Sequence, residues 1–279
     1  MVLAFNAATV AAEPIAPGVV RQKLMTQERV KDTRVAIDRL TLTTDATAWL
    51  ELSATALGWL HMLEGEATLK AHLYADRMSD SHSAFLPAGL NVTLSTSKGA
   101  SLLYAEIADV GRVDPGFETD RAFFTVVDWT REPVLVCKQD ARKRIALVSK
   151  ELCQTKAMRA AMVIYPAGTA APKYHQEGAE SVIYVLDGHG TAWVDQQSTS
   201  VRQHDVIHIP DRVPHYLQAA GNTDLRFLAL QVPGECKTVW ADPKKSSAWR
   251  STEMDIHGRR PAQEERERRA YALGGGFAS

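Results

Sequence analysis

Two stretches of the sequence decide its fold: WLHMLEGEAT at residues 59–68 and VIYVLDGHGT at residues 182–191. Each reads as a strand, an acidic residue followed by glycine in a turn, and a second strand. The glycine of each turn lies 22 residues before a proline, Pro87 in the first half and Pro210 in the second. Because both features recur at a period of 123 residues, the sequence predicts two copies of one structural unit.

Both halves read as short β-rich segments, such as SLLYAEIADV at residues 101–110 and DLRFLALQV at residues 224–232. Turns rich in Gly, Pro, Asp and Asn separate these segments, a pattern typical of an all-β sandwich or barrel. We therefore expect an all-β fold with two barrels in tandem and short helical or irregular termini. In the tail, the run PAQEERERRAYAL predicts a short charged helix or a frayed terminus. The expected parts are a lead-in over 1–34, a first barrel over 35–111, a linker over 112–154, a second barrel over 155–235 and a tail over 236–279.

The composition excludes several classes of protein. Lysine and arginine total 32 against 33 aspartate and glutamate, so no net field attracts nucleic acid or an anionic membrane. The 45% apolar and 23% charged residues are ordinary for a globular chain and exclude disordered and fibrous classes. The wide spacing of Cys137, Cys153 and Cys236 argues against a disulfide framework and a cysteine-based zinc site. With no signal peptide and no long apolar run, we expect a soluble cytoplasmic protein without nucleic-acid or membrane partners.

The spacing of residues in the second half resembles the first motif of the cupin family. That motif is Gly, five residues, His-x-His, three or four residues, Glu, six residues, Gly. With Gly188 as the closing glycine and the shorter gap, His175, Glu177 and Ser181 occupy the His, His and Glu positions.

The second cupin motif is matched in part. It runs Gly, five residues, Pro-x-Gly, two residues, His. Pro210 and His215 fall in place, whereas His204 and Arg212 stand where the family has glycine. The resemblance covers both predicted barrels and implies a duplicated cupin, or bicupin, made of two double-stranded β-helix (jelly-roll) barrels.

The resemblance also implies a metal site in the second barrel, with His175, Glu177 and His215 as ligands. Residues i and i+2 of a strand share one face, so His175 and Glu177 can meet one ion, and His215 can complete the set from a later strand. Two imidazoles and one carboxylate suit a divalent Fe(II) or Mn(II) ion with open positions, while Zn and Ni remain open alternatives. Ser181 would leave the fourth ligand position without a carboxylate.

Two other registers and one arrangement without metal remain open. The longer family gap places Tyr174 and Gln176 in the two His positions, which would destroy the ligand set. Pairing His175 with Glu180 would require a slipped strand. Alternatively, His175 and Glu177 form a hydrogen-bonded pair at the mouth of the barrel and hold no metal.

The first half lacks candidate ligands. The same offsets from Gly65 place Leu52, Ala54 and Gly58 in the first-motif positions, and Val92 in place of the distal histidine. Since none of these can bind a metal, we expect a first barrel that is packed shut and supports the second barrel or an oligomer.

The second barrel offers further candidate site residues. Tyr174 and Glu180 are candidate catalytic proton carriers. A guanidinium group can hold a substrate carboxylate through two parallel hydrogen bonds. The candidate substrate-binding residues are Arg212, Arg226, Trp193 and Tyr216.

Three classes of function fit these residues. The leading prediction is a mononuclear metal-dependent enzyme of the bicupin type, a dioxygenase, that acts on a small carboxylated or hydroxylated metabolite. The first alternative is a non-redox metal-dependent hydrolase, lyase or isomerase resembling the ureidoglycine aminohydrolases, and the second is a non-catalytic cupin that binds a ligand. The triad also resembles that of iron and 2-oxoglutarate oxygenases, although the gap before its distal histidine is short for them. We expect a homodimer or higher homo-oligomer that pairs through edge strands.

Overall fold

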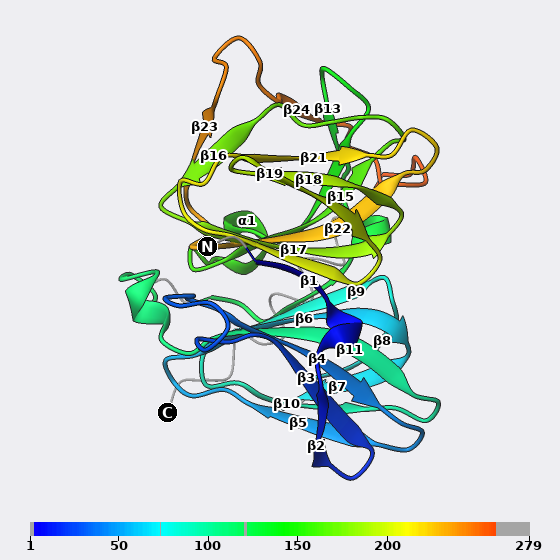
Figure 1. The fold of residues 1–279 in the computed structure, drawn as a ribbon. Helices are drawn as coiled ribbons and strands as arrows, with labels where there is room; N and C mark the ends of the chain where they lie inside the picture. The colour runs from blue at the N-terminus through cyan, green and yellow to red at the C-terminus, as the bar shows by residue number, and fades with distance from the viewer. Residues whose placement is uncertain (1–2, 73, 120–121, 261–279) are drawn as a thin grey trace. The chain divides into compact units, whose positions relative to one another are not determined.

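The structure is a computed structural model in which nearly all regular elements are strands (Figure 1). It divides into two compact units, which we call the N-terminal and the C-terminal barrel. Among the described residues, no helix is both long and apolar enough to cross a lipid bilayer. The described residues are 3–72, 74–119 and 122–260. Within them, the N-terminal barrel contains residues 10–129 and 150–155, and the C-terminal barrel contains residues 3–9, 130–149 and 156–260.

The N-terminal barrel consists of antiparallel strands and a few short helical turns. Its strands are β2 (Ala12–Ala16), β3 (Val19–Met25), β4 (Ala36–Leu42), β5 (Thr47–Glu51), β6 (Leu57–Gly65), β7 (Ala67–Ala71), β8 (Tyr74–Met78), β9 (His82–Leu86), β10 (Asn91–Ser95), β11 (Ala100–Ile107) and β12 (Thr125–Asp128). They form a seven-stranded sheet of order β12-β9-β6-β11-β4-β3-β2 and a four-stranded sheet of order β5-β10-β7-β8. Among the described residues, the helical segments of both barrels are α1 (Lys150–Cys153) and 3-10 turns at Ala7–Thr9, Val110–Arg112 and Trp129–Arg131.

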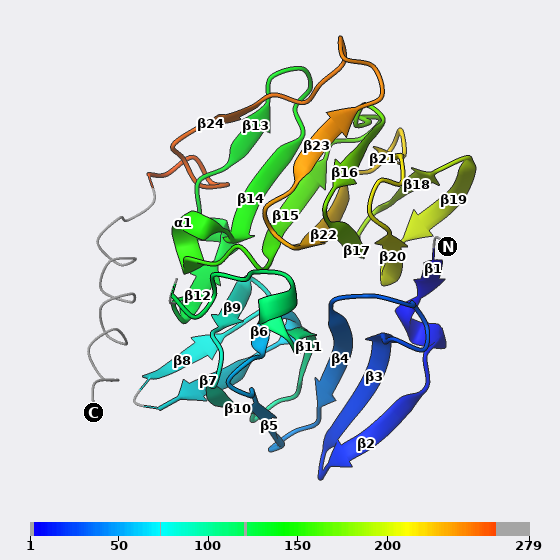
Figure 2. The ribbon, with the colours of Figure 1, turned by 90° about the vertical axis from the view of Figure 1, so that its left-hand side faces the viewer.

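The C-terminal barrel repeats this plan with two further antiparallel sheets (Figure 2). Its strands are β1 (Leu3–Asn6), β13 (Leu135–Cys137), β14 (Lys143–Val148), β15 (Arg159–Tyr165), β16 (Tyr174–Glu177), β17 (Glu180–Asp187), β18 (His189–Val194), β19 (Gln197–Arg202), β20 (Asp205–Ile209), β21 (His215–Ala219), β22 (Leu225–Val232), β23 (Lys237–Trp240) and β24 (Trp249–Ser251). The eight-stranded sheet has the order β1-β20-β17-β22-β15-β14-β13-β24, and the five-stranded sheet has the order β19-β18-β21-β16-β23.

The predicted duplication is confirmed strand by strand. The order β20-β17-β22-β15-β14-β13 repeats the order β9-β6-β11-β4-β3-β2, and β15 and β20 begin and end 123 residues after β4 and β9. Gly65 and Gly188 have φ of +76° and +79°, a region that favours glycine. A Cβ at these positions would lie 2.3 Å from the carbonyl oxygen of Gly99 and 1.9 Å from that of Asp224. Glycine is therefore required at the turn that identified the repeat.

The interior of the N-terminal barrel is closed by apolar side chains, as predicted. Leu50, Leu52 and Val92 are buried in one apolar cluster, and a Cβ on Gly58 would lie 3.2 Å from neighbouring side chains. Leu50 is the cross-strand partner of Val92, so Leu50 and Leu52 face inward. Ala54 is exposed outside the strands and is not an interior position, which corrects its predicted place.

The segments outside the two predicted barrels contribute strands to both. The lead-in supplies β1, which pairs with β20 of the C-terminal barrel, and β2 and β3, which extend the larger N-terminal sheet. The linker supplies β12 to the N-terminal barrel and β13 and β14 to the C-terminal one. The tail supplies β23 and β24. The predicted charged helix begins at Pro261 and lies outside the described residues.

Candidate functional site

The register of strand β16 decides which of its side chains enter the barrel. Tyr174 lies directly across from His215 of β21, and directly opposed residues of an antiparallel pair face the same side. His215 lines the interior cavity and is buried. Side chains alternate along a strand, so Tyr174 and Gln176 face inward, while His175 and Glu177 face outward. The register with the longer family gap is therefore the one that the chain adopts.

The predicted metal triad is not assembled, because its members lie on opposite faces of one sheet. On the outer face, Nε2 of His175 lies 3.7 Å from Oε1 of Glu177, and Nζ of Lys237 lies 3.5 Å from Oε2 of the same carboxylate. The Lys237 ammonium lowers the pKa of Glu177. His215 is on the inner face. In the part of the chain that the structure describes, no group of three His, Cys, Asp or Glu residues could hold a metal ion.

Two of the predicted substrate-binding residues, Trp193 and Tyr216, also point away from the interior of the barrel. Trp193 and Tyr216 stack on each other with ring centroids 4.6 Å apart and an interplanar angle of 3°. Ala192, next to Trp193, and Leu217, next to Tyr216, are buried in the barrel core. Because side chains alternate along a strand, the stacked rings lie on the other face of the sheet. Neither residue lines the cavity.

The predicted arginines and the predicted acid lie outside the cavity as well. Arg212 is exposed in the turn before β21, with φ of +60° in the position of a motif glycine. Arg226 alternates with Phe227, which faces inward, and its Nη2 lies 3.8 Å from Oδ2 of Asp187. Glu180 is buried, but its Oε2 lies 2.8 Å from Nε2 of His208, on the face of β17 opposite the cavity. Of the predicted site residues, only Tyr174 and His215 line the cavity.

The interior of the C-terminal barrel contains a cavity of about 330 Å³. Its walls come from both sheets and from the tail strands β23 and β24. In the part of the chain that the structure describes, no aspartate or glutamate lines it, although three arginines do. The polar and aromatic lining residues are Arg142, Arg144, Arg159, Tyr165, Tyr174, Gln176, Ser181, His215, Phe227, Gln231, Thr238, Trp240, Ser247 and Trp249.

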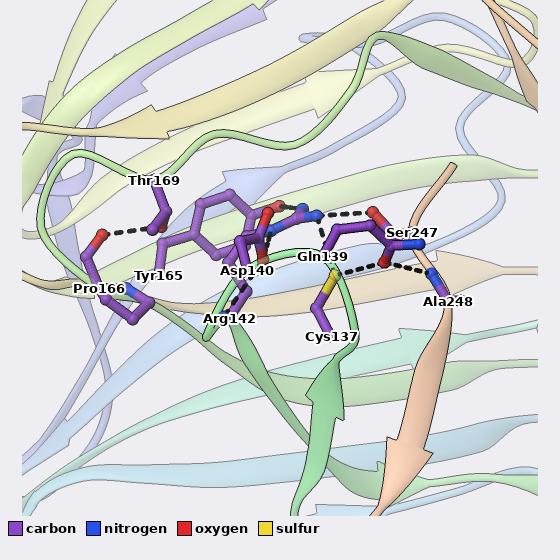
Figure 3. A network of polar contacts seen from close by, with 9 residues as sticks. All are labelled: Cys137, Gln139, Asp140, Arg142, Tyr165, Pro166, Thr169, Ser247 and Ala248. Carbon is purple, nitrogen blue, oxygen red and sulfur yellow. Dashed lines mark hydrogen bonds and ion pairs between the residues drawn. The ribbon is translucent and has the colours of Figure 1, made fainter. Parts of the chain in front are cut away.

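Arg142 is a structural member of this wall (Figure 3). It is almost fully buried, and its Nε donates to Oδ1 of Asp140 at 2.7 Å. Its Nη2 donates to Oγ of Ser247 at 2.6 Å, and its Nη1 donates to the Tyr165 hydroxyl at 3.3 Å. Burial alone would lower the pKa of Arg142, but the hydrogen bond that it donates to Asp140 and its interactions with Tyr165 together raise the pKa above its ordinary value. Arg142 thus has a carboxylate partner and fastens the tail to the barrel.

Arg144 and Arg159 differ from Arg142 because no carboxylate in the described part of the chain pairs with them. Nε of Arg159 donates to Oε1 of Gln231 at 2.8 Å, which orients the guanidinium group. Within the described residues the guanidinium of Arg144 has no hydrogen bond and no ion pair. Burial and, to a smaller extent, the nearby Arg159 cation lower the pKa of Arg144 to about 10, so it remains charged at neutral pH. The cavity therefore holds two uncompensated positive charges.

In the N-terminal barrel, the arginine at the position equivalent to Arg144 is paired with acidic residues. Arg21 of β3 stands 123 residues before Arg144 of β14. Its Nη2 lies 2.6 Å from Oε1 of Glu13 and its Nη1 lies 3.9 Å from Oδ2 of Asp38. The positions matching these two acids in the second half are valine and alanine. The equivalent arginine is thus neutralised in the N-terminal barrel, whereas in the C-terminal barrel it has no acidic partner among residues 3–72, 74–119 and 122–260.

Asp38 gives a pH-dependent prediction for the N-terminal barrel. Burial raises its pKa from 3.8 to about 6 against the opposing pull of Arg21. The carboxyl group of Asp38 binds its proton more tightly in the folded than in the unfolded chain. Its contribution to the free energy of unfolding is therefore fully present below about pH 4 and is lost as the pH rises through about 6. We expect Asp38→Asn to raise the free energy of unfolding by up to about 3 kcal/mol at about pH 8 and to leave it unchanged at about pH 4. Urea midpoints at both pH values measure this, and a variant less stable than the parent at pH 8 would contradict it.

His215 and Tyr174 add two neutral groups to the cavity. Nδ1 of His215 donates to the carbonyl oxygen of Val213 at 2.9 Å, which leaves Nε2 as an acceptor. Burial lowers the pKa of His215 to about 4, so the ring is neutral at neutral pH. The ring of Tyr174 lies 4.4 Å from the imidazole, and burial raises its pKa, so it remains a phenol.

Comparison with known proteins agrees with this architecture. A family model described as "Cupin domain" matches residues 161–231. The oxalate-binding protein of Thermotoga maritima is 31% identical over 84 residues, which are 30% of this chain and 69% of that protein. The chain belongs to the cupin superfamily. A Methanocaldococcus jannaschii protein, MJ1618, is 30% identical over 73 residues, 26% of this cupin and 58% of the relative, so the match spans little more than half of that relative.

Solved structures extend the likeness to both barrels of this cupin. A variant of Bacillus subtilis oxalate decarboxylase OxdC superposes with a TM-score of 0.69 at 13% identity, covering 85% of this chain and 79% of the other. Another structure of that enzyme, described for its Mn(II) centres, gives 0.68 at 14% identity with the same coverage. The Escherichia coli protein YlbA gives 0.68 at 14% identity, covering 83% and 90%. Divalent metal thus occurs among the structural neighbours of this cupin, and identity this low shows the fold alone.

The interior of this cupin does not fit such a metal. Tyr174, Gln176, Ser181 and His215 occupy the four positions that hold the family's ligands, so one imidazole is left. Oε1 of Gln176 already accepts hydrogen bonds from Oγ1 of Thr238 at 3.1 Å and from Sγ of Cys236 at 3.2 Å. A divalent ion would meet no carboxylate there and would lie among guanidinium groups, an unfavourable charge arrangement.

Several residues that line this cavity were beyond the motif analysis because they lie outside the motifs. Arg144 falls in the predicted linker, and Trp240 and Trp249 fall in the predicted tail. One signal could have found Arg144. Arg144 lies 123 residues after Arg21, at the period of the repeat, so the duplication relates it to a residue of the first half.

Proposed function

We propose that the C-terminal barrel of this cupin binds a small organic anion through Arg144 and Arg159, without a protein-held metal. The observation that carries the proposal is the Arg144 guanidinium, which faces a cavity and has no hydrogen bond or ion pair within the described residues. Arg144 is half-buried, and covering its unpaired charge with a bound molecule is costly unless that molecule brings a counter-charge. A carboxylate matches the planar donor geometry of guanidinium and would supply both charge and hydrogen bonds.

The size and chemistry of the cavity favour a small ligand. A volume of about 330 Å³ lies at the lower end of the range for small-molecule pockets. Trp240, Trp249 and Phe227 provide apolar contact area around the polar groups. One relative, 31% identical over 84 residues, is named an oxalate-binding protein, which supports a compact carboxylate as the ligand.

Of the three predicted classes of function, the geometry supports the non-catalytic ligand-binding cupin best. The dioxygenase and the metal-dependent hydrolase, lyase or isomerase both require the ligand set whose predicted members lie on opposite faces of the sheet. Glu180, a predicted proton carrier, is outside the cavity. Tyr174 and His215 are the remaining groups that could exchange a proton with a bound molecule, and neither is charged at neutral pH.

A binding panel tests the proposal on the full chain. Isothermal titration calorimetry and thermal unfolding would compare oxalate, malonate, succinate and benzoate with phosphate, sulfate and a neutral diol. We expect at least one carboxylate to bind with a stoichiometry of one and to raise the unfolding temperature, while the diol does neither. Failure of every carboxylate to bind would refute the proposal.

Removal of metal is expected to leave carboxylate binding unchanged, because guanidinium groups and not a cation would hold the anion. The measurement is the dissociation constant of the best carboxylate before and after dialysis against EDTA, with metal content followed by mass spectrometry. Loss of binding in EDTA that Mn(II) restores would contradict this expectation.

A further inference from the structure

We infer that the ligand of the C-terminal barrel carries a hydroxyl group besides its carboxylate, and that His215 is the residue that selects it. The inference rests on the proposed function and names the class of ligand more narrowly, as hydroxycarboxylates. It depends on how hydrogen-bond donors and acceptors are distributed around the cavity.

Among the described residues that line the cavity, the guanidinium and amide groups are donors, the hydroxyls can donate or accept, and Nε2 of His215 can only accept. Oε1 of Gln176 accepts from Thr238 and Cys236, and Oε1 of Gln231 accepts from Arg159. Their amide nitrogens remain as donors, beside the guanidinium groups. The neutral His215 ring donates through Nδ1 to Val213, so its Nε2 can only accept.

A ligand that ignored Nε2 of His215 would leave this buried acceptor without a partner. Such an unsatisfied group costs about 1–3 kcal/mol, which corresponds to roughly 5- to 150-fold in affinity. The matching ligand group must therefore donate a hydrogen bond. An ammonium group would bring a third positive charge near Arg144 and Arg159, with no acidic side chain lining the cavity to balance it. A hydroxyl donates without that repulsion.

The two recognition points lie in one small cavity. Arg144, Tyr174 and His215 all line it, and the ring centroid of Tyr174 lies 4.4 Å from that of His215. The carboxylate and the hydroxyl of the ligand can therefore be joined by a short carbon chain. The cavity volume of about 330 Å³ likewise limits the ligand to a small molecule.

The test uses pairs of acids that differ by one hydroxyl: succinate with malate, glutarate with 2-hydroxyglutarate, and propionate with lactate. Calorimetry on the full chain is expected to show that each hydroxy acid binds about tenfold tighter than its partner. His215→Leu is expected to abolish this preference while the binding of the deoxy acid persists. His215→Asn, whose amide oxygen can accept, is expected to recover part of it and covers a failure of the leucine variant to fold.

Matched controls separate this inference from the proposed function. His175→Leu changes a histidine on the outer face of the neighbouring strand and is expected to leave the preference intact. Arg144→Gln is expected to weaken both members of each pair equally. If carboxylates bind but the hydroxyl makes no difference, or if the preference survives in His215→Leu, the inference is overturned and the proposed function stands. If no carboxylate binds, both fail.

Discussion

Arg144→Gln is expected to weaken carboxylate binding by roughly a hundredfold, the largest loss that we expect from a single substitution in this chain. The change removes the positive charge and the paired donors but keeps a polar side chain of similar length. Truncating one partner of a buried hydrogen-bonded charge pair costs about 2–5 kcal/mol, and about 2.8 kcal/mol is a hundredfold in the dissociation constant. Calorimetry with the best carboxylate of the panel measures the effect.

The duplicated architecture supplies the matched control for this variant. Arg21→Gln alters the equivalent arginine of the N-terminal barrel, where Glu13 and Asp38 neutralise the charge. We expect it to leave the dissociation constant unchanged. Equal losses in the two variants would show that the effect is one of general charge or stability. Unaltered binding in Arg144→Gln would remove the central argument for an anion site.

The second large effect is a gain of metal binding. The combined substitutions Tyr174→His, Gln176→His and Ser181→Glu restore the family's ligand types at positions that line the cavity beside His215. Three imidazoles and a carboxylate form a set suited to a divalent transition metal. We expect the variant to bind Mn(II) or Zn(II) with one ion per chain, whereas the parent binds none at the same concentration. Equilibrium dialysis with metal analysis measures the difference.

The same experiment discriminates between the two strand registers. If His175 and Glu177 faced the interior, as the shorter gap predicts, substitutions at 174 and 176 would point outward and create no site. The control is His175→Ala in the substituted background, which is expected to keep the bound metal. Loss of the ion in that control would restore the shorter-gap register.

The fold could be predicted from the sequence because the repeat is carried by glycine turns. Gly65 and Gly188 each stand where a Cβ would collide with a carbonyl oxygen, so the turn keeps its residue while the strands around it diverge. The short apolar, β-rich segments between turn residues predicted the strands themselves. The bounds of the two barrels were less well predicted. Strands β3 and β14 carry charged side chains, and such segments resemble polar loops until their partner strands are known.

The candidate site was predicted less well, for a reason of register. A shift of one residue in a strand moves every side chain to the other face. The shorter gap was attractive because His175 and Glu177 are good ligands, yet on the outer face Glu177 lies between His175 and Lys237. Arg144 and Arg159 carry no local signature that separates them from surface arginines. Their role follows from the closing of the barrel around them and from the lack of an acidic residue among the side chains that line the cavity.

The cation-lined wall of the cavity also bears on how ligand choice can change among related chains. The family model covers residues 161–231, whereas the wall begins at Arg142 and ends at Trp249. Related chains could therefore change the ligand that they bind through substitutions in the segments on either side of residues 161–231, while the shared core stays the same. Grouping such chains by their core alone would then place together proteins that recognise different metabolites.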